Sequence, residues 1–519
     1  MMRNIIKIDL NNIGIFLLIF LPAALVAGPF LAEIIINFIA IKFLIENLKS
    51  RNNSYLKDYL FIFFLLFYFI QIVSLINSEI FSESALNVFS YIRYPLFVFG
   101  VADLLEKKKT GLKYLYFSIT LTIFIVTLDG FKQFFSDTNV FGYPKYRIDR
   151  ISGFFNDDLI LGSYLFRFFP VLLALTLFFE NKTSKNVFYF NIILLLSIYI
   201  LTFLTGERSS FILLSIFVII IMVLLQISIR FKIYFLTFTI IIFSSILFIN
   251  PTMKDRYIDQ IIIQVFDKNK KLSLSEYKPM YDTSIKMFKR NPILGIGTKG
   301  YRYHCNDPAY ITYFYDRKFV KDNTKIKIDF GWKEIRNLNI IEIYVNDGDE
   351  ISVGEKLFSF HFIGDKKNIQ IFNSNLDGKI LKIHKRDLTA DGIRRYVNND
   401  LFAEIKPSNL PDQETGYYDS CNTHPHNFYL QLLAETGLLG FSLIFAMFLY
   451  LSYLIIKIAI DLYFFKKKNF NNLEICLIVY FFVILWPLIP TGNFFNNWLN
   501  IISIFPLGIY LYVKKINNN

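Results

Sequence analysis

The chain is dominated by apolar blocks that alternate with short polar segments. Most of these blocks hold about 20 residues, the length of helix that crosses the hydrocarbon core of a bilayer. Blocks so long and so uniformly apolar are typical of membrane-spanning helices. We therefore predict about twelve transmembrane helices, at 12–27, 29–47, 58–77, 86–105, 112–130, 158–180, 186–204, 208–227, 231–249, 427–459, 472–490 and 496–513.

The first apolar block follows Arg3 and Lys7, as the apolar core of a signal peptide would. No convincing cleavage site follows it, and the next apolar block begins at once. We therefore predict that the first block is an uncleaved span.

The placement of basic residues predicts how the chain is threaded. A net charge of +13 could suggest a nucleic-acid partner, but the short loops on one side hold most of the excess. With the N-terminus cytoplasmic, these loops contain Lys49, Arg51, Lys57, Lys107, Lys108, Lys109, Lys113, Lys182, Lys185, Arg230, Lys232, Lys466, Lys467 and Lys468. The opposite short loops near 78–85 and 491–495 hold no Lys or Arg. This positive-inside pattern predicts cytoplasmic N- and C-termini in a multi-pass membrane protein, without nucleic acid.

A long polar segment separates the last three predicted spans, in residues 427–519, from the first nine, in residues 1–249. Topology places this segment outside. Its first part, 250–321, has amphipathic helical periodicity, and such helices either lie on the membrane surface or pack on the bundle. Its last part, 408–426, returns the chain to the membrane. The predicted fold class is an α-helical polytopic membrane protein with a small all-β periplasmic insert.

Residues 322–407 carry the pattern of that β module. Alternating stretches such as Lys325–Ile328 and Ile340–Val345 indicate strands, and Asn346–Asp349 and Leu376–Lys379 indicate turns. The run from Val345 to Leu357, followed by 377–383, resembles a biotinyl/lipoyl-like barrel-sandwich hybrid. That family carries its cofactor on a lysine at a hairpin tip, whereas the tip here, Phe372–Asn375, has none. We expect no swinging-arm cofactor, and a role as a glycan- or partner-contacting accessory or as a spacer.

The three cysteines divide into one apolar and two outer-side positions. Cys476 lies in a predicted span and is expected to be inert. Cys305 and Cys421 flank the insert, and an oxidising compartment would allow them to pair. We predict a disulfide that clamps the two ends of the insert.

Several arginines depart from the positive-inside pattern. Arg147, Arg150 and Arg208 fall on the outer side, and Arg93 and Arg167 lie within apolar spans. Charge within a span is unfavourable unless it is paired or functional. The candidates for anion ligands are therefore Arg150 and Arg208 first, with pairing to a lipid phosphate or a local carboxylate as the alternative.

Four stretches together resemble the O-antigen ligase/O-antigen polymerase superfamily of membrane glycosyltransferases. They are Arg150–Asn156, Leu204–Ser210, Asn291–Gly297 and His424–Gly437, in that order along the chain. The resemblance implies transfer of a glycan from undecaprenyl diphosphate on the periplasmic face of the bacterial inner membrane. A ligase of this superfamily uses lipid A-core as the acceptor, and a polymerase uses another lipid-linked repeat. The resemblance also implies an enzyme without metal, cofactor or nucleotide sugar.

The residues in these stretches suit that chemistry. Arginine binds diphosphate through its planar, permanently charged fork, so we assign Arg150 and Arg208 to the leaving group, with Arg302 as a third candidate. Histidine can remove the proton of an attacking sugar hydroxyl near neutral pH. The resemblance places the base at His426, with His424 as second choice.

Other interpretations of these residues remain open. The two histidines and Cys421 could bind a metal, although their spacing suits no four-ligand site, or the histidines could be simple interfacial residues. Glu435 and Gly437 are expected to be structural, through a buried hydrogen bond and close helix contact. For the whole chain, a lipid-linked glycan flippase and a non-enzymatic export scaffold are the competing functions.

Overall fold

The computed structural model describes two compact units. The described residues are 9–51, 53–147, 149–265, 277–307, 309–316, 325–328, 337–352, 354–362, 369–374, 378–385, 394–397, 400–407, 416–419 and 421–518. One unit is helical and comprises residues 1–273, 280–310 and 421–519, whereas the other comprises 274–279 and 311–420. Arg3 and Lys7, which directed attention to a signal peptide, lie outside the described residues.

The helical unit contains a helix at each of the twelve predicted spans. These helices are α1 (Leu10–Ala27), α2 (Pro29–Ser50), α3 (Tyr59–Ser74), α5 (Arg93–Lys107), α6 (Gly111–Ser136), α7 (Leu161–Phe178), α8 (Lys185–Leu204), α9 (Arg208–Leu224), α10 (Ile229–Ile249), α16 (Phe428–Tyr463), α17 (Asn472–Ile484) and α18 (Asn497–Asn518). A further helix, α4 (Phe81–Ser90), leads into α5.

Within the described residues, nine helices are long and apolar enough to cross a membrane, with α4 and α5 taken together. The predicted spans outside this set are α2, which carries several charged residues, and the shorter apolar helices α9 and α17. The structure therefore supports a polytopic helical membrane protein, and the count of twelve crossings remains a prediction.

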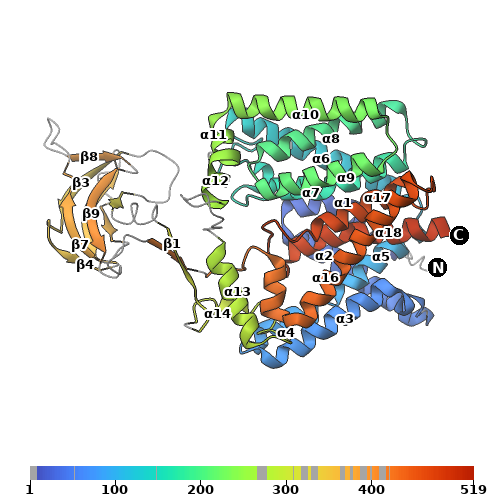
Figure 1. Cartoon of the computed structure of the whole chain (residues 1–519), viewed down its shortest axis with the longest axis horizontal. Coiled ribbons are helices and arrows are strands. Elements are labelled where there is room, and N and C mark those ends of the chain that lie inside the picture. Colours follow the sequence, from blue (N-terminus) through green and yellow to red (C-terminus); the bar gives the residue numbers. More distant parts are fainter. Residues whose placement is uncertain are drawn as a thin grey trace, which may run out of the picture. The chain divides into compact units, whose positions relative to one another are not determined.

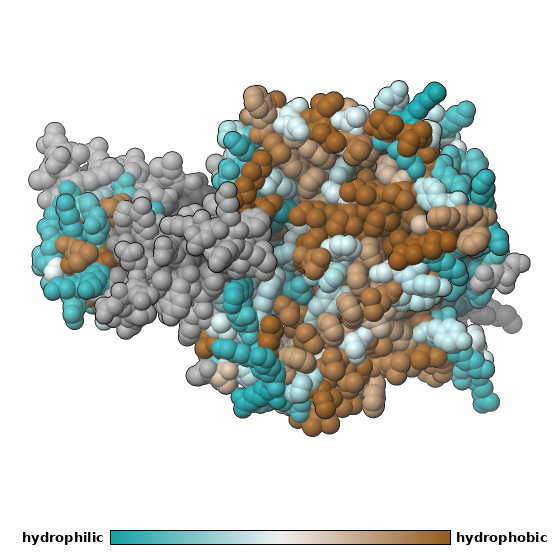
Figure 2. Space-filling model, in the orientation of Figure 1, coloured by the Kyte–Doolittle hydropathy of each residue, from teal (hydrophilic) through white to brown (hydrophobic). Residues whose placement is uncertain are grey.

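Several helices begin at a capping side chain. Asp9 and Asp58 accept hydrogen bonds from the backbone N–H groups of Asn11 and Leu60 at the starts of α1 and α3. In the interior, α5 packs against α2 and α18, and α7 packs against α8 and α17. The outer surface of this unit is largely apolar between more polar ends (Figure 2). On α10 the one buried residue is Thr239, and side chains such as Leu236 and Phe248 are exposed, as expected of a lipid-facing helix.

Short helices gather at one end of the helical unit, and the chain termini lie at the opposite end (Figure 1). They are α11 (Pro251–Lys254), α12 (Gln260–Val265), α13 (Lys278–Arg290) and α14 (Tyr301–His304), with a π-helical turn at Asp255–Asp259. Within the predicted segment 250–321, helices thus occur at 251–265, 278–290 and 301–304, whereas 291–300 forms turns. On α13, Met280, Thr283, Ser284 and Met287 are buried, which favours packing on protein over lying on a membrane surface.

Every described element of the second unit between 311 and 420 is a strand. The ribbon β1 (Tyr313–Asp316) and β10 (Gly416–Asp419) pairs antiparallel. One four-stranded sheet has the order β2–β9–β7–β4, and the other has the order β6–β5–β3–β8. The strands are β2 (Lys325–Lys327), β3 (Asn337–Ile343), β4 (Glu350–Ile351), β5 (Lys356–Phe362), β6 (Gln370–Asn373), β7 (Gly378–Ile383), β8 (Arg394–Val397) and β9 (Leu401–Pro407).

The two sheets share one apolar core. Phe358 on β5 and Phe402 on β9 come from different sheets, and their ring centroids are 4.6 Å apart. The strand region is wider than the predicted 322–407, because β1 and β10 pair beyond both of its ends. The turn predicted at Leu376–Lys379 and the tip at Phe372–Asn375 fall partly on residues 375–377, outside the described residues. The likeness to a biotinyl/lipoyl-like module remains a prediction.

Candidate functional site

A break in α16 organises the region around the histidines. Gly437 has φ +64°, in the left-handed region, and an added Cβ would overlap with the backbone of Ile293. The break leaves backbone groups of α16 available to the 291–297 loop. Ile296 N–H donates to Ala434 O at 2.9 Å, and Leu438 N–H donates to Pro292 O at 2.8 Å. The expected close contact at Gly437 is therefore made with this loop.

Glu435 fixes the next segment against α16. Its carboxylate accepts hydrogen bonds from the backbone N–H of Lys299 at 2.8 Å and of Tyr301 at 3.2 Å. Gln431 Nε2 donates to the same carboxylate at 3.3 Å. The buried hydrogen bond predicted for Glu435 is thus present, and it holds the start of α14, which carries Arg302.

Cys305, directly after α14, is joined to Cys421 in a disulfide, with their Cα atoms 4.8 Å apart. Both cysteines belong to the helical unit. The bond links α14 to the segment that carries the histidines. It also engages the Cys421 sulfur that the metal-site alternative would have used as a thiolate ligand.

Thr491 holds the two histidines in place from the facing loop. Its N–H donates to His426 O at 2.8 Å, and its hydroxyl accepts from Phe428 N–H at 2.9 Å. Its carbonyl lies 3.3 Å from His424 Nε2. Asn427 caps α16 by accepting from the N–H groups of Tyr429 and Leu430. The histidines therefore occupy a hydrogen-bonded turn directly before a helix.

The hydrogen bonds distinguish the two imidazoles. A carbonyl oxygen can only accept, so His424 Nε2 carries the proton and His424 Nδ1 accepts from the Thr423 hydroxyl at 2.9 Å. His426 Nε2 lies 3.2 Å from Asn422 Nδ2, which can only donate. His426 Nε2 is therefore unprotonated. The two rings are near each other, with centroids 4.3 Å apart.

Both histidines are neutral near pH 7. Burial lowers the pKa of His424 to about 4, helped by the neighbouring His426 and by the charge of Arg302. Burial also lowers the pKa of His426. A neutral imidazole with an unprotonated Nε2 can accept a proton, so His426 has the form that a general base requires.

Arg150 and Arg208 belong to a second cluster, at the starts of α7 and α9. Arg150 donates to Leu159 O at 2.9 Å and lies 4.0 Å from the Glu207 carboxylate. Glu207 is itself engaged, because it accepts from the backbone N–H groups of Gly162 at 2.7 Å and Ser163 at 3.0 Å. Arg150 Nε and Arg208 Nη1 are buried without a hydrogen-bond partner among the described residues. These N–H groups can bind an anion.

Arg256, on the π-helical turn, completes the cluster. Its Nε donates to Gly206 O at 3.0 Å, and its Nη1 lies 3.4 Å from Asp149. Burial, followed by the positive charge of Arg208, lowers the pKa of Arg256. The sequence interpretation missed this residue, although the rule that selected Arg150 applies to it. Arg256 lies in the long outer segment, which contains many lysines and several other arginines, so nothing in the sequence set it apart.

The remaining arginines have structural partners. Arg93 forms an ion pair with Glu33 at 3.0 Å, and Arg167 donates to Ser503 Oγ at 3.1 Å. Arg147 pairs with Asp149 at 3.1 Å. Their placement is explained by these contacts. The structure thus gathers the sequence-predicted residues into two groups: Arg302 with His424 and His426, and Arg150 with Arg208.

Both groups belong to the end of the helical unit that carries the short helices (Figure 1). The histidine group reaches α14 through the disulfide, and the arginine group reaches the π-helical turn after α11 through Arg256. The arrangement combines a neutral histidine with anion-binding N–H groups at one end of an apolar bundle. Such a site can bind an anionic leaving group and accept a proton.

Comparison with known proteins gives one family match for this chain. Residues 190–324, which include Arg208, Arg256 and Arg302, match the family model described as O-antigen ligase. No curated protein matches the chain. The apolar helices and this match over residues 190–324 support the O-antigen ligase superfamily, whose members are membrane glycosyltransferase-like enzymes of ligase or polymerase type.

Proposed function

We propose that this protein transfers a glycan from undecaprenyl diphosphate to an acceptor hydroxyl on the periplasmic face of the inner membrane, with lipid A-core as the acceptor. The observation that carries the proposal is that a proton acceptor and anion-binding donors lie at the same end of the helical bundle. His426 Nε2 is unprotonated, and Arg150 and Arg208 each present a buried N–H without a partner among the described residues. The family match supports the same reaction class.

In this mechanism, the acceptor O–H gives its proton to His426 Nε2 as its oxygen attacks the anomeric carbon. The bond between that carbon and the diphosphate oxygen breaks, and the electron pair leaves with undecaprenyl diphosphate. Arg150 and Arg208 stabilise the charge that develops on this leaving group. Arg256 adds a third cation beside them, while Asp149 and Glu207 keep the guanidinium groups in place. All protein groups in these steps come from this chain.

A polymerase of the same superfamily is the second candidate, because its donor chemistry is identical and only the acceptor differs. The decisive assay supplies purified protein with undecaprenyl-diphosphate glycan and offers lipid A-core and a second lipid-linked repeat in competition. The proposal predicts a lipid A-core conjugate as the main product. Chains of repeats on the lipid carrier would support the polymerase, and glycan movement across vesicles without transfer would support a flippase.

The rate of transfer is expected to stay constant from about pH 8 down to about pH 6.5, the ordinary histidine pKa. A base must be unprotonated, and burial lowers the pKa of His426, so protonation removes it only at lower pH. The measurement is kcat/KM against pH at constant ionic strength. An acidic fall in rate that begins above pH 7 would contradict a base with a lowered pKa.

The β insert is expected to affect acceptor choice more than chemistry. Asp316 and Gly416 are paired at the end of the β1–β10 ribbon, so a two-residue Asn-Gly turn can replace residues 317–415 and preserve Cys305 and Cys421. This variant should keep donor cleavage and lose discrimination between acceptors in the competition assay. Retention of the disulfide, tested by alkylation, is the folding control. Complete loss of transfer in a folded variant would argue for a direct catalytic role.

A further inference from the structure

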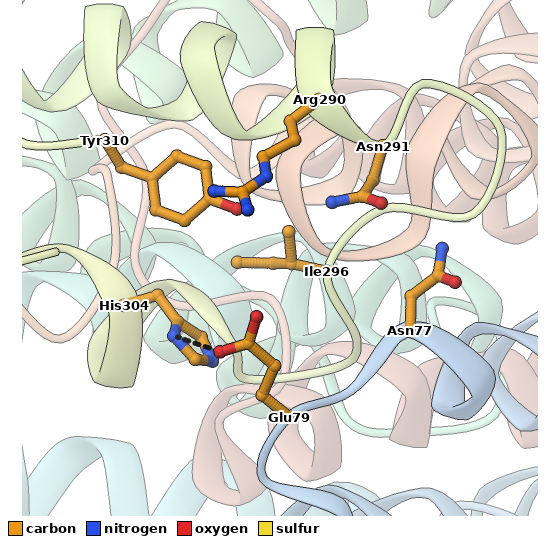
Figure 3. Close-up of a pocket in the computed structure, with 7 residues that line it drawn as sticks. All are labelled: Asn77, Glu79, Arg290, Asn291, Ile296, His304 and Tyr310. Carbon is orange, nitrogen blue, oxygen red and sulfur yellow. Dashed lines mark ion pairs between the residues drawn. The ribbon is translucent and has the colours of Figure 1, made fainter. Parts of the chain in front are cut away.

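A polar pocket lies beside α14, within the helical unit (Figure 3). Its volume is about 210 Å³, and it is lined by Asn77, Glu79, Arg290, Asn291, Ile296, His304 and Tyr310. Six of these seven side chains can donate or accept hydrogen bonds, and Ile296 is the single aliphatic one. None of them belongs to the histidine pair or to the arginine cluster described above.

Contacts with fixed elements hold the walls of the pocket. Asn77 Nδ2 donates to Gly295 O at 3.1 Å, and Ile296 is tied to α16 through Ala434. His304 Nδ1 lies 3.7 Å from Glu79, and the Arg290 guanidinium carbon lies 5.4 Å from the Tyr310 ring centroid. Figure 3 shows the Glu79–His304 pair facing Arg290 and Tyr310 across Ile296. The pocket is therefore built from segments that α16 and α13 position.

The geometry points to a binding site for one sugar residue of the transferred glycan or of its acceptor, an inference that rests on the proposed function and deepens it. A sugar hydroxyl both donates and accepts hydrogen bonds, so its site needs acceptors such as Glu79 and donors such as Arg290. The lining supplies both acceptors and donors, and the side-chain amides of Asn77 and Asn291 can act as either. Tyr310 and Ile296 offer apolar surface for the C–H groups of the ring.

Other ligand classes fit the lining less well. Glu79 would repel a phosphate group, and Arg290 would repel a metal cation. An acyl chain would leave most of these polar groups without hydrogen bonds. Pockets for drug-sized ligands are larger, about 300–1,000 Å³, so this volume suits a single ring rather than an oligosaccharide.

The pocket is near the proposed reaction centre along a short covalent path. His304 precedes Cys305, Cys305 is bonded to Cys421, and His424 follows three residues later. With about 3.8 Å between consecutive Cα atoms, this path keeps the His304 and His424 Cα atoms within about 20 Å. This distance is short enough for a glycan with one sugar in the pocket to extend to the base over a few sugar residues.

Two substitutions test the pocket with little risk to folding. Glu79→Gln removes a carboxylate whose side chain is 72% exposed, and Arg290→Met removes the donors but keeps a chain that covers Tyr310. Their matched controls are Glu83→Gln on α4 and Lys289→Met on α13, both exposed positions. The probe is the repeat-unit oligosaccharide, released from its lipid carrier by mild acid, and its binding is followed by saturation-transfer NMR.

Wild-type protein, the controls and His426→Asn should bind the oligosaccharide, and saturation should centre on one sugar ring. Each pocket variant should lose about tenfold or more in affinity, the effect of one hydrogen bond to a charged group. In transfer assays, KM should rise by a similar factor while kcat changes little. A rise in the KM of the donor alone assigns the sugar to the donor, and a rise for lipid A-core alone assigns it to the acceptor.

Equal binding by pocket variants and controls, with unchanged KM values, would overturn the inference and leave the proposed function intact. A different result would separate the saccharide site from the proposed transferase function. If the pocket variants lose oligosaccharide binding but wild-type protein transfers no glycan to any acceptor, the saccharide site stands and the proposed transferase function fails.

Discussion

Replacing His426 with alanine is expected to abolish glycan transfer while the protein remains inserted and folded. The imidazole is the proposed base, and the loss of a positioned base lowers a rate by about 10²–10⁴-fold. His426 has φ 54°, in the left-handed region, where alanine adds backbone strain. His426→Asn is therefore the sharper variant, because asparagine tolerates this conformation and has no basic nitrogen. Transfer is measured with purified protein and undecaprenyl-diphosphate glycan.

His424→Asn is the matched comparison for that variant. His424 donates its Nε2 proton to Thr491 O, so its substitution should lower the rate less than the same change at His426. His384→Asn, in the β unit where the imidazole contacts Glu404, should leave donor cleavage unchanged. Normal transfer by both His426 variants would refute the assignment of the base. A greater loss at His424 than at His426 would move the base to His424.

Replacing Arg208 with lysine is expected to lower the transfer rate by about 10²-fold, although the positive charge is kept. Arg208 Nη1 is buried without a partner among the described residues, and a guanidinium can donate two parallel hydrogen bonds to one phosphate. The lysine ammonium is a single point charge on a flexible stem and cannot reproduce that fork. Loss of one pre-organised donor to a developing anion commonly lowers kcat by about 10²–10³-fold.

The matched control is Arg230→Lys, which makes the same exchange at an exposed position at the start of α10. Rates are compared at saturating acceptor, and binding of undecaprenyl diphosphate is measured separately. The transfer rate and the affinity for undecaprenyl diphosphate should both fall for Arg208→Lys, and neither should change for Arg230→Lys. Full activity in Arg208→Lys would favour a plain role in topology or surface charge.

The sequence supported the prediction of the helical elements because the bilayer imposes a strong local rule. A span needs about 20 apolar residues, so each block could be recognised without its neighbours. Helices occur at all twelve predicted positions, and strands occur at Lys325–Lys327 and Asn337–Ile343, where residues alternate. The β1–β10 ribbon was missed because each strand is four residues long and its partner lies about 100 residues away.

For the candidate site, the residue types were predictable and their relations were not. His424, His426, Arg150 and Arg208 stood out from sequence because polar and charged groups beside a membrane are exceptional. Arg256 and Thr491 were not singled out, since nothing local distinguishes an arginine in a lysine-rich segment or a threonine in a short loop. Their roles arise from Gly206 and the histidine segment, which are distant in the chain.

By itself, the sequence determined the membrane class of this protein, the order of its helices and the side chains available for chemistry. Those properties follow from local hydropathy and from residue type. The tertiary structure alone decided that His426 Nε2 faces the Asn422 amide donor while His424 Nε2 faces the Thr491 carbonyl acceptor, and that Arg256 stands beside Arg208. The physical reason is that protonation, burial and anion binding depend on hydrogen-bond partners, which only folding brings together.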